Sequence, residues 1–266
     1  MVTIFAWFGY DLPKTEYFKT IKQAGFDGVS LWWADDLGDG DYRSNPELVR
    51  KLGLHVENIH APFDKVNNLW LDNLDGSGFM DYLLGLVDDC SQYDIPAMVL
   101  HLTDGNPPPY SEIGLDRIKR LIDKAENRNI NVAFENLSRI EYLEYVLSNV
   151  DSPRAGFCYD SGHHICHTPD TDLISRYGSR LMALHLHDND GMQDQHKLPF
   201  DGTINWADTM GRIGLTGYKG AAALEVNSIN YSTLPPEQFM RMACERAKKL
   251  ETMMKQKDIT LILPEY

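Results

Sequence analysis

The feature that most constrains the fold is a regular alternation of short apolar segments with longer amphipathic ones. Eight segments are typical of β-strands, because they are short, rich in β-branched and aromatic residues and bounded by turn residues. The segments between them show helical periodicity. Such alternation predicts a parallel sheet whose strands are joined by crossover helices. The predicted strands cover 3–8, 28–33, 55–60, 97–102, 131–135, 155–160, 183–187 and 220–226, and the predicted helices 14–24, 46–52, 79–93, 111–127, 140–148, 170–177, 205–213 and 236–255.

The length of the chain indicates how these units are arranged. Its 266 residues are close to the size of one (β/α)₈ barrel, and no low-complexity linker divides them. Short turns with a glycine, such as AGFDG at 24–28 and KLGL at 51–54, lead from a helix to the next strand, whereas the loops after the strands are longer and more polar. We therefore predict an α/β fold with a single TIM-barrel domain over residues 1–266 and an active site at the C-terminal ends of the strands.

The predicted strands repeatedly end in a carboxylate or an imidazole. Such groups are costly to bury unless they are paired or bind a metal, so packing alone does not explain them. In a closed barrel the C-terminal strand ends meet at one point, and the side chains would form one cluster. The residues concerned are His60, His101, Glu135, Asp160, His185 and Glu225, with His163 just after Asp160.

Four of these residues, from predicted strands five to eight, form the predicted metal site. Three carboxylates and one imidazole suit a divalent ion such as Mn²⁺, Zn²⁺, Co²⁺ or Mg²⁺. The four residues are Glu135, Asp160, His185 and Glu225. An outer set of ligand-type side chains could hold further metal ions or contact a substrate, and consists of His60, His101, His163, Asp194 and His196.

Aromatic residues near the ends of the first two strands predict a wall for a small ligand. Trp32 and Trp33 must point to opposite sides of their strand, so at least one is expected to face the pocket. We predict Trp7 and Trp33 as walls that suit the C–H face of a sugar. His187, near His185, is a further predicted substrate contact.

The composition narrows the range of partners. The chain has 39 acidic and 25 basic residues, a formal net charge of −14, and no dense basic cluster that would neutralise a nucleic-acid backbone. No apolar run is long enough to cross a membrane, the first residues do not resemble a signal peptide, and the four cysteines imply no disulfide framework. We expect a soluble cytoplasmic protein, with a homo-oligomer possible, that does not bind nucleic acid or a nucleotide cofactor.

Several motifs together resemble those of a known superfamily. FEN at 134–136, the D-x-x-H of YDSGH at 159–163, HLHDND at 185–190, DQHKLPFDG at 194–202 and LEVN at 224–227 are similar to motifs of the xylose isomerase-like TIM-barrel superfamily. This superfamily includes sugar phosphate isomerases and epimerases as well as endonuclease IV. The resemblance covers most of the chain, starting from IHAPF at 59–63.

Resemblance to the sugar epimerases implies one metal ion on Glu135, Asp160, His185 and Glu225. Glu135 and Glu225 would then move a proton at a carbon next to a carbonyl, and His163 would contact a substrate hydroxyl. The substrate would be a sugar, a sugar acid or a polyol; a dehydratase of inosose type would use the same proton abstraction. Those epimerases typically carry an arginine shortly after the strand-seven histidine, whereas this loop, HLHDNDGMQDQH, has none.

Resemblance to endonuclease IV implies a different activity. Its three-zinc site has nine ligands, and this sequence has a match for each of them, which would make the protein a phosphodiesterase. The acidic composition argues against a DNA substrate, because such an enzyme needs a basic groove. The matching residues are His60, His101, Glu135, Asp160, His163, His185, Asp194, His196 and Glu225.

Overall fold

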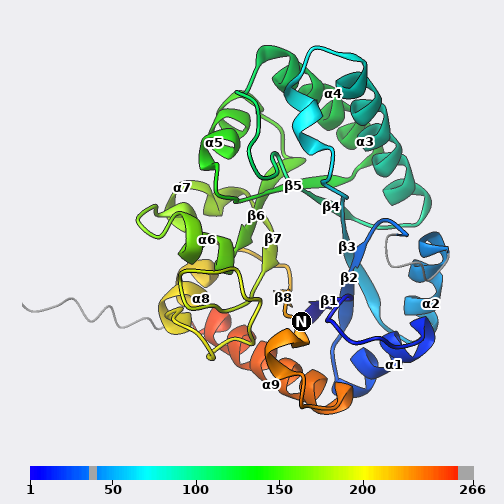
Figure 1. The fold of residues 1–266 in the computed structure, drawn as a ribbon, viewed down its shortest axis with the longest axis vertical. Coiled ribbons are helices and arrows are strands. Elements are labelled where there is room, and N and C mark those ends of the chain that lie inside the picture. The colour runs from blue at the N-terminus through cyan, green and yellow to red at the C-terminus, as the bar shows by residue number, and fades with distance from the viewer. Residues whose placement is uncertain (36–40, 257–266) are drawn as a thin grey trace, which may run out of the picture.

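Eight parallel strands form a nearly closed barrel with the helices on its outside (Figure 1). The structure is a computed structural model that describes residues 1–35 and 41–256. Its strands neighbour one another in the order β7-β6-β5-β4-β3-β2-β1-β8, and a bridge between Leu186 and Leu224 joins the two ends of this row. The predicted (β/α)₈ barrel is thereby confirmed. The strands are β1 (Val2–Phe5), β2 (Gly28–Trp32), β3 (His55–His60), β4 (Ala97–Leu100), β5 (Asn131–Glu135), β6 (Ala155–Asp160), β7 (Leu181–His185) and β8 (Ala222–Leu224).

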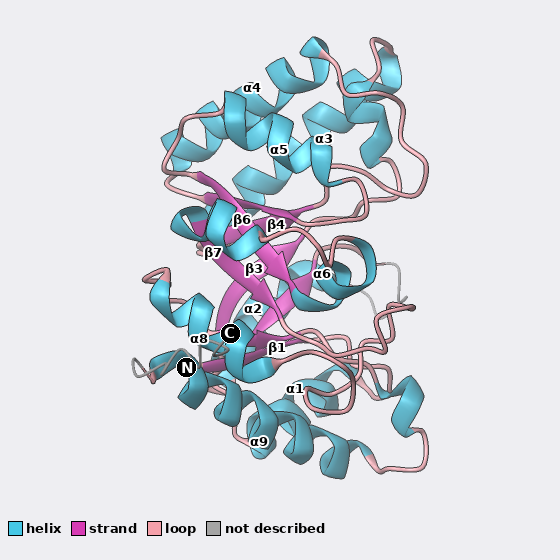
Figure 2. Ribbon diagram, turned by 90° about the vertical axis from the view of Figure 1, so that its left-hand side faces the viewer, coloured by secondary structure: helices cyan, strands magenta, loops and turns pink. Residues whose placement is uncertain are grey.

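The helices surround the strands, as the side view in Figure 2 also shows. In the described part of the chain, four short 3₁₀ segments lie in the connections. None of the described helices has the length and apolar character needed to cross a bilayer. The helices are α1 (Lys14–Ala24), α2 (Asn45–Lys51), α3 (Leu74–Gln92), α4 (Glu112–Arg128), α5 (Ile140–Asn149), α6 (Ser161–His167), α7 (Leu173–Tyr177), α8 (Trp206–Leu215) and α9 (Pro236–Lys255), and the 3₁₀ segments are η1 (Tyr42–Ser44), η2 (Val66–Trp70), η3 (Gly178–Arg180) and η4 (Ser228–Tyr231).

Two helices differ from the sequence prediction because of their N-terminal caps. Helix α3 begins at Leu74 rather than Phe79, since the side chain of Asn73 accepts a hydrogen bond from the Gly76 N–H at 2.8 Å. The sequence did not predict α6, which follows β6 directly. The predicted turns after α1 and α2 are confirmed, because Gly25 and Gly53 have φ values of 96° and 73°, the left-handed conformation that glycine adopts without strain.

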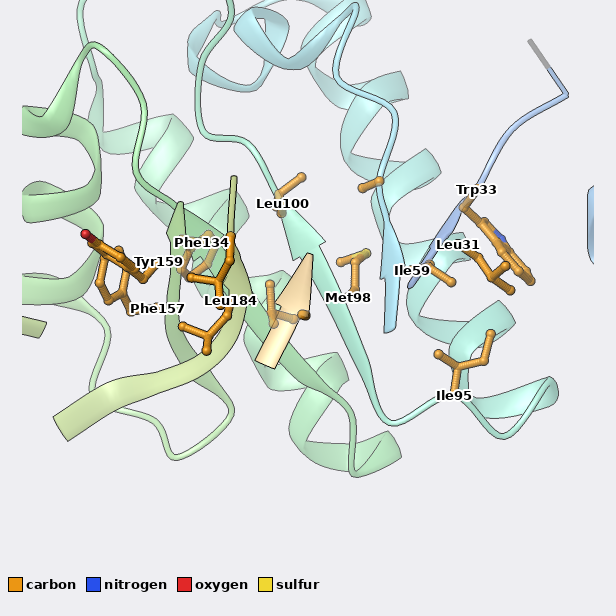
Figure 3. Close-up of a cluster of buried hydrophobic side chains, with 14 of the residues drawn as sticks. Leu31, Trp33, Ile59, Ile95, Met98, Leu100, Phe134, Phe157, Tyr159 and Leu184 are labelled. Atoms are coloured by element: carbon orange, nitrogen blue, oxygen red, sulfur yellow. The ribbon is translucent and has the colours of Figure 1, made fainter. Parts of the chain in front are cut away.

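Alternation along the strands separates the packed core from the site. Large apolar side chains such as Leu31, Leu100, Phe134, Phe157 and Leu184 face outward toward the helices (Figure 3). The inner face carries a second, smaller cluster of buried residues. Side chains two positions apart lie on the same face, so each of these is followed on the inner face by a predicted site residue. The inner cluster is Val99, Ala133, Cys158 and Ala183, and the residues that follow are His101, Glu135, Asp160 and His185.

Candidate active site

Glu135 is the centre of the cluster at the strand ends. Its carboxylate is buried and lies against imidazoles from four other segments of the chain. Oε2 is 3.3 Å from Nε2 of both His60 and His101 and 3.1 Å from Nδ1 of His185, while Oε1 is 3.0 Å from Nδ1 of His163. The structure therefore brings residues more than a hundred positions apart in sequence around one carboxylate.

The second glutamate is placed by the pairing that closes the barrel. The Glu225 N–H donates a hydrogen bond to the Leu186 carbonyl at 3.2 Å, beside the β7–β8 bridge. Its Oε2 lies 3.0 Å from Nδ1 of His185, on the ring nitrogen that Glu135 also approaches. Glu135 and Glu225 therefore lie on the two sides of one imidazole nitrogen.

Asp160 is held by three neighbours at the end of β6. Its backbone N–H donates to Oδ1 of Asn136 at 2.8 Å, and its backbone carbonyl accepts from Nδ2 of Asn136 at 2.9 Å. Its carboxylate accepts from the His163 N–H at 2.6 Å and so caps α6, which carries His163 into the site. Nε2 of His187 lies 3.1 Å from each carboxylate oxygen. These contacts fix the direction of the carboxylate.

Backbone carbonyls orient two imidazoles of the outer set. Nδ1 of His60 lies 3.0 Å from the carbonyl oxygen of Ala61, and Nδ1 of His196 lies 2.8 Å from that of Glu225. A carbonyl oxygen only accepts, so each Nδ1 donates its proton, and in the neutral form of the ring Nε2 is the lone-pair nitrogen. Metal-binding histidines commonly have this arrangement.

The four predicted core ligands fit one divalent ion. One ligand atom each from Glu135, Asp160, His185 and Glu225 lie within 4.8 Å of one another. Ligands about 2.1 Å from a shared ion are at most about 4.2 Å apart, so small adjustments would complete such a site. Nδ1 of His185 is buried and makes no hydrogen bond of normal geometry, although the carboxylates of Glu135 and Glu225 lie 3.1 and 3.0 Å from it. A buried nitrogen of this kind needs a partner, and an ion between the carboxylates would provide one.

The electrostatics of the metal-free site are dominated by these charges. Burial raises the pKa of the Glu135 carboxyl, but His185 and His101 outweigh burial and hold its pKa well below the usual range. Burial likewise raises the pKa of Glu225, and His185 lowers it below the usual range. Burial lowers the pKa of His163, whereas Asp160, Asp194 and Glu135 raise it well above normal. Both glutamates are therefore carboxylates at neutral pH.

Asp194 and His196 reach the cluster because a buried carboxylate organises their loop. Asp188 accepts hydrogen bonds on Oδ1 and Oδ2 from four donors in residues 189–206. The loop brings Oδ2 of Asp194 to 3.0 Å from Nε2 of His196 and 3.4 Å from Nε2 of His163. The donors to Asp188 are the backbone N–H groups of Asn189, Phe200 and Ile204 and the indole N–H of Trp206, at 3.0, 2.9, 3.2 and 2.7 Å.

A cavity of about 400 Å³ opens onto the cluster. Among the described residues that line it there is no lysine or arginine. Its walls combine the acidic and imidazole side chains with apolar and aromatic ones, a combination typical of a small-molecule site. The lining residues are Phe5, Trp7, Trp32, His60, Phe63, His101, Glu135, His163, Asp194, His196, Glu225, Val226 and Asn227.

The structure corrects two predicted substrate contacts. Trp33 is fully buried beside Leu31 in the apolar layer (Figure 3), and its indole N–H donates to Asp89 at 2.8 Å, so its choice as a wall was wrong. Trp32 lines the cavity instead. His187 is also fully buried; it lies behind Asp160 and stacks on His196 at 4.0 Å without lining the cavity. Trp7, 41% exposed, lines the cavity as predicted.

Several residues of the site were not predicted. Phe5 and Phe63 line the cavity, and the ring of Phe63 stacks on His101 with centroids 4.3 Å apart. Alternation along β1 could have indicated Phe5, which follows Thr3 on the same face. Asn136 and Asp188 act through backbone hydrogen bonds, and the sequence contains no periodic signal for such contacts.

This fold and this site define a class: (β/α)₈ barrels with a carboxylate–imidazole cluster at the C-terminal strand ends. The xylose isomerase-like TIM barrel family model matches residues 18–250, and the chain belongs to that family. The predicted superfamily is thereby confirmed.

Curated relatives and solved structures of comparable length are similar to this chain. It is 26% identical to the uncharacterized protein y4fM of Sinorhizobium fredii over 92% of this chain and 91% of that protein. It is 22% identical to fructoselysine 3-epimerase of Shigella flexneri over 90% of this chain and 94% of that protein. A probable endonuclease 4 of Mycoplasma mycoides is 26% identical over 52% of this chain and 55% of that protein. A D-tagatose 3-epimerase-like protein has a TM-score of 0.73 at 18% identity, covering 96% and 98%, which shows a shared fold.

Proposed function

We propose that the protein is a divalent-metal-dependent isomerase or epimerase of a neutral sugar, sugar acid or polyol. The observation that carries the proposal is the placement of Glu135 and Glu225 on both sides of the His185 nitrogen, at the wall of one cavity. Epimerases among the similar proteins support it. A dehydratase that starts with the same proton abstraction is a close variant.

The acid–base chemistry follows from the two carboxylates. One glutamate, ionised at neutral pH, removes the proton from the carbon next to the substrate carbonyl. The other glutamate must first take up a proton from solvent, and its carboxyl then delivers that proton to the carbon. Glu135, Asp160, His185 and Glu225 would hold the ion. When bound there, a divalent ion would polarise the carbonyl oxygen and make the adjacent C–H more acidic. The phenylalanine and tryptophan walls would hold the C–H face of the substrate.

Phosphodiester hydrolysis is the second candidate, because all nine residues matching the endonuclease IV ligands lie in this cluster or beside it. Two observations argue against it. The described lining of the cavity has no lysine or arginine, and the chain carries a net charge of −14. A DNA backbone requires such cations.

The proposed function is tested by adding Mn²⁺ to the protein in deuterium oxide with ketoses, inososes and aldoses. We expect deuterium to enter the carbon next to the carbonyl, detected by NMR, and the exchange to stop when the ion is removed by a chelator. Cleavage of a duplex containing an abasic site, with no sugar exchanged, would contradict the proposal.

The number of bound ions is expected to depend on pH. Burial lowers the pKa of His196, but Asp194 and Glu225 raise it to about 9, so His196 is protonated at pH 7 in the metal-free protein. An ion ligated by His196 must displace that proton. We expect one ion per chain at pH 7. At a second site, which we call the outer site because it uses Asp194 and His196 of the outer set, we expect the affinity for zinc to rise about tenfold per pH unit up to about pH 9.

Elemental analysis after gel filtration, combined with zinc titrations between pH 6.5 and 9, measures this dependence. The variant His196→Gln should keep the first ion and lose the pH-dependent uptake. Three zinc ions per chain already at pH 6.5 would show that the outer residues form metal sites without competition from protons.

A further inference from the structure

A second cavity, of about 340 Å³, adjoins the one at the metal site. Its lining comes from residues between Ala6 and Phe18 and from Leu31, Trp32, Ala34 and Asn45, and we call it the side chamber. Trp7 and Trp32 line both cavities, so the two indoles form the boundary between them. Cavities of roughly 300–1,000 Å³ are typical of small-molecule sites, so each is large enough for a ligand of its own.

The described lining of the side chamber is aromatic and has no excess of one charge. The hydroxyl of Tyr10 donates to the Leu234 carbonyl at 2.8 Å, and that of Tyr17 accepts from the Phe8 N–H at 2.6 Å, so both rings are anchored. Its charged lining residues in the described chain are Asp11 and Lys14, of opposite sign. The Lys14 ammonium also donates to the chain itself, to the carbonyl oxygen of Asp41 at 2.9 Å. These features suit a neutral ligand better than an anion.

The lining includes an acceptor that has no partner among the described residues. Oδ1 of Asn45, at the start of α2, is buried and has no hydrogen bond within the described structure. A buried acceptor left unpaired costs about 1–3 kcal/mol, so such atoms usually have a partner. A hydroxyl group of a ligand in the chamber would donate to it.

We propose that the side chamber binds a neutral, hydroxylated substituent, a second sugar ring, attached to the sugar that reacts between Glu135 and Glu225. This inference rests on the proposed function for the reacting half of the substrate. The metal-site cavity alone has room for a monosaccharide. The chamber beyond Trp7 and Trp32 has the aromatic faces that a linked ring requires, and an acceptor that has no partner in the described structure. The preferred substrate is therefore a glycosyl-ketose rather than a free ketose.

The test compares D-fructose with glucosyl- and galactosyl-fructoses linked through different oxygens: isomaltulose, lactulose and turanose. Solvent deuterium incorporation in the Mn²⁺-loaded protein gives kcat/KM, and saturation-transfer NMR reports contact with the distal ring whether or not turnover occurs. We expect at least one disaccharide to exceed fructose about tenfold in kcat/KM, with saturation transfer to its distal ring.

Two variants locate the effect. Ala34→Trp places an indole in the chamber and should lower the disaccharide-to-fructose ratio of kcat/KM about tenfold and abolish transfer to the distal ring. Gly85→Trp adds the same side chain on α3, where a Cβ meets nothing within 4 Å. This variant should leave the disaccharide-to-fructose ratio of kcat/KM and the saturation transfer to the distal ring unchanged.

The outcomes separate the two proposals. If fructose exchanges deuterium as fast as every disaccharide and no distal ring receives saturation, the chamber assignment is wrong while the proposed function stands. If no sugar exchanges, the proposed function fails, and saturation transfer in the wild type and Ala34→Trp still decides the chamber. If the protein instead prefers fructosyl-lysine, a ketose that carries a charged lysine, the assignment of the chamber to a neutral ring is wrong.

Discussion

Replacing Glu135 or Glu225 by glutamine is expected to slow deuterium exchange into a bound sugar about a thousandfold, about 4 kcal/mol of transition-state stabilisation. Each variant removes a carboxylate that lies about 3 Å from Nδ1 of His185. Glutamine keeps the size of the side chain but accepts no proton from carbon. The exchange rate, measured by NMR with Mn²⁺ at saturation, checks the prediction for each variant separately.

Glu57→Gln is the matched control. Glu57 belongs to β3 but does not line the cavity; it accepts hydrogen bonds from the Thr3 hydroxyl and the Ala221 N–H. Burial raises the pKa of its carboxyl, although Thr3 opposes this, so an amide resembles its protonated form. The control should exchange deuterium at the wild-type rate. Glu135→Gln and Glu225→Gln that fold, bind Mn²⁺ and still exchange at that rate would disprove the assignment of the acid–base pair.

Asp188→Asn is expected to lower the free energy of unfolding by about 3 kcal/mol and to weaken zinc binding at the outer site. An asparagine turns an amide N–H₂ toward donors that now point at a carboxylate oxygen, so at least one buried N–H loses its partner. The loop that carries Asp194 and His196 would shift as a result. Denaturant unfolding of the metal-free protein and zinc titration measure the two effects.

Asp190→Asn separates this effect from a general loss of charge in the loop. Asp190 is exposed and accepts from the N–H groups of Met192 and Gln193 at 2.9 and 3.1 Å. Water can replace those bonds, so we expect a loss below about 1 kcal/mol. Equal losses in the two variants would show that the burial of Asp188 has no special part in holding the loop.

The fold and the centre of the site could be predicted because both follow from local patterns. Alternation identifies the strands, and parallel strands in one barrel bring their C-terminal ends together whatever the loops do. Glu135, Asp160 and His185 therefore had to lie close to one another once the barrel was inferred. Their roles as ligands and bases stay predictions that the experiments above address.

The parts that the sequence did not predict depend on details of backbone geometry. The choice between Trp32 and Trp33 depends on where β2 ends and on an irregular register between β2 and β3 at Val29 and Ser30. Helix α6 forms because Asp160 caps it, although its sequence, SGHHICH, has no helical pattern of apolar residues. His187 lies two residues beyond the end of β7, where strand alternation no longer determines its direction.

Closure of the barrel has a consequence for folding kinetics. The predicted core ligands come from β5, β6, β7 and the residue after β8, and Glu225 reaches the others only when the Leu186–Leu224 bridge has formed. An ion that needs all of them binds the native state and not the partly formed barrel before it. Mn²⁺ should therefore slow unfolding and leave the refolding rate nearly unchanged, which stopped-flow measurements with and without the ion would show. The ion would stabilise the closed barrel against unfolding without helping the barrel to form.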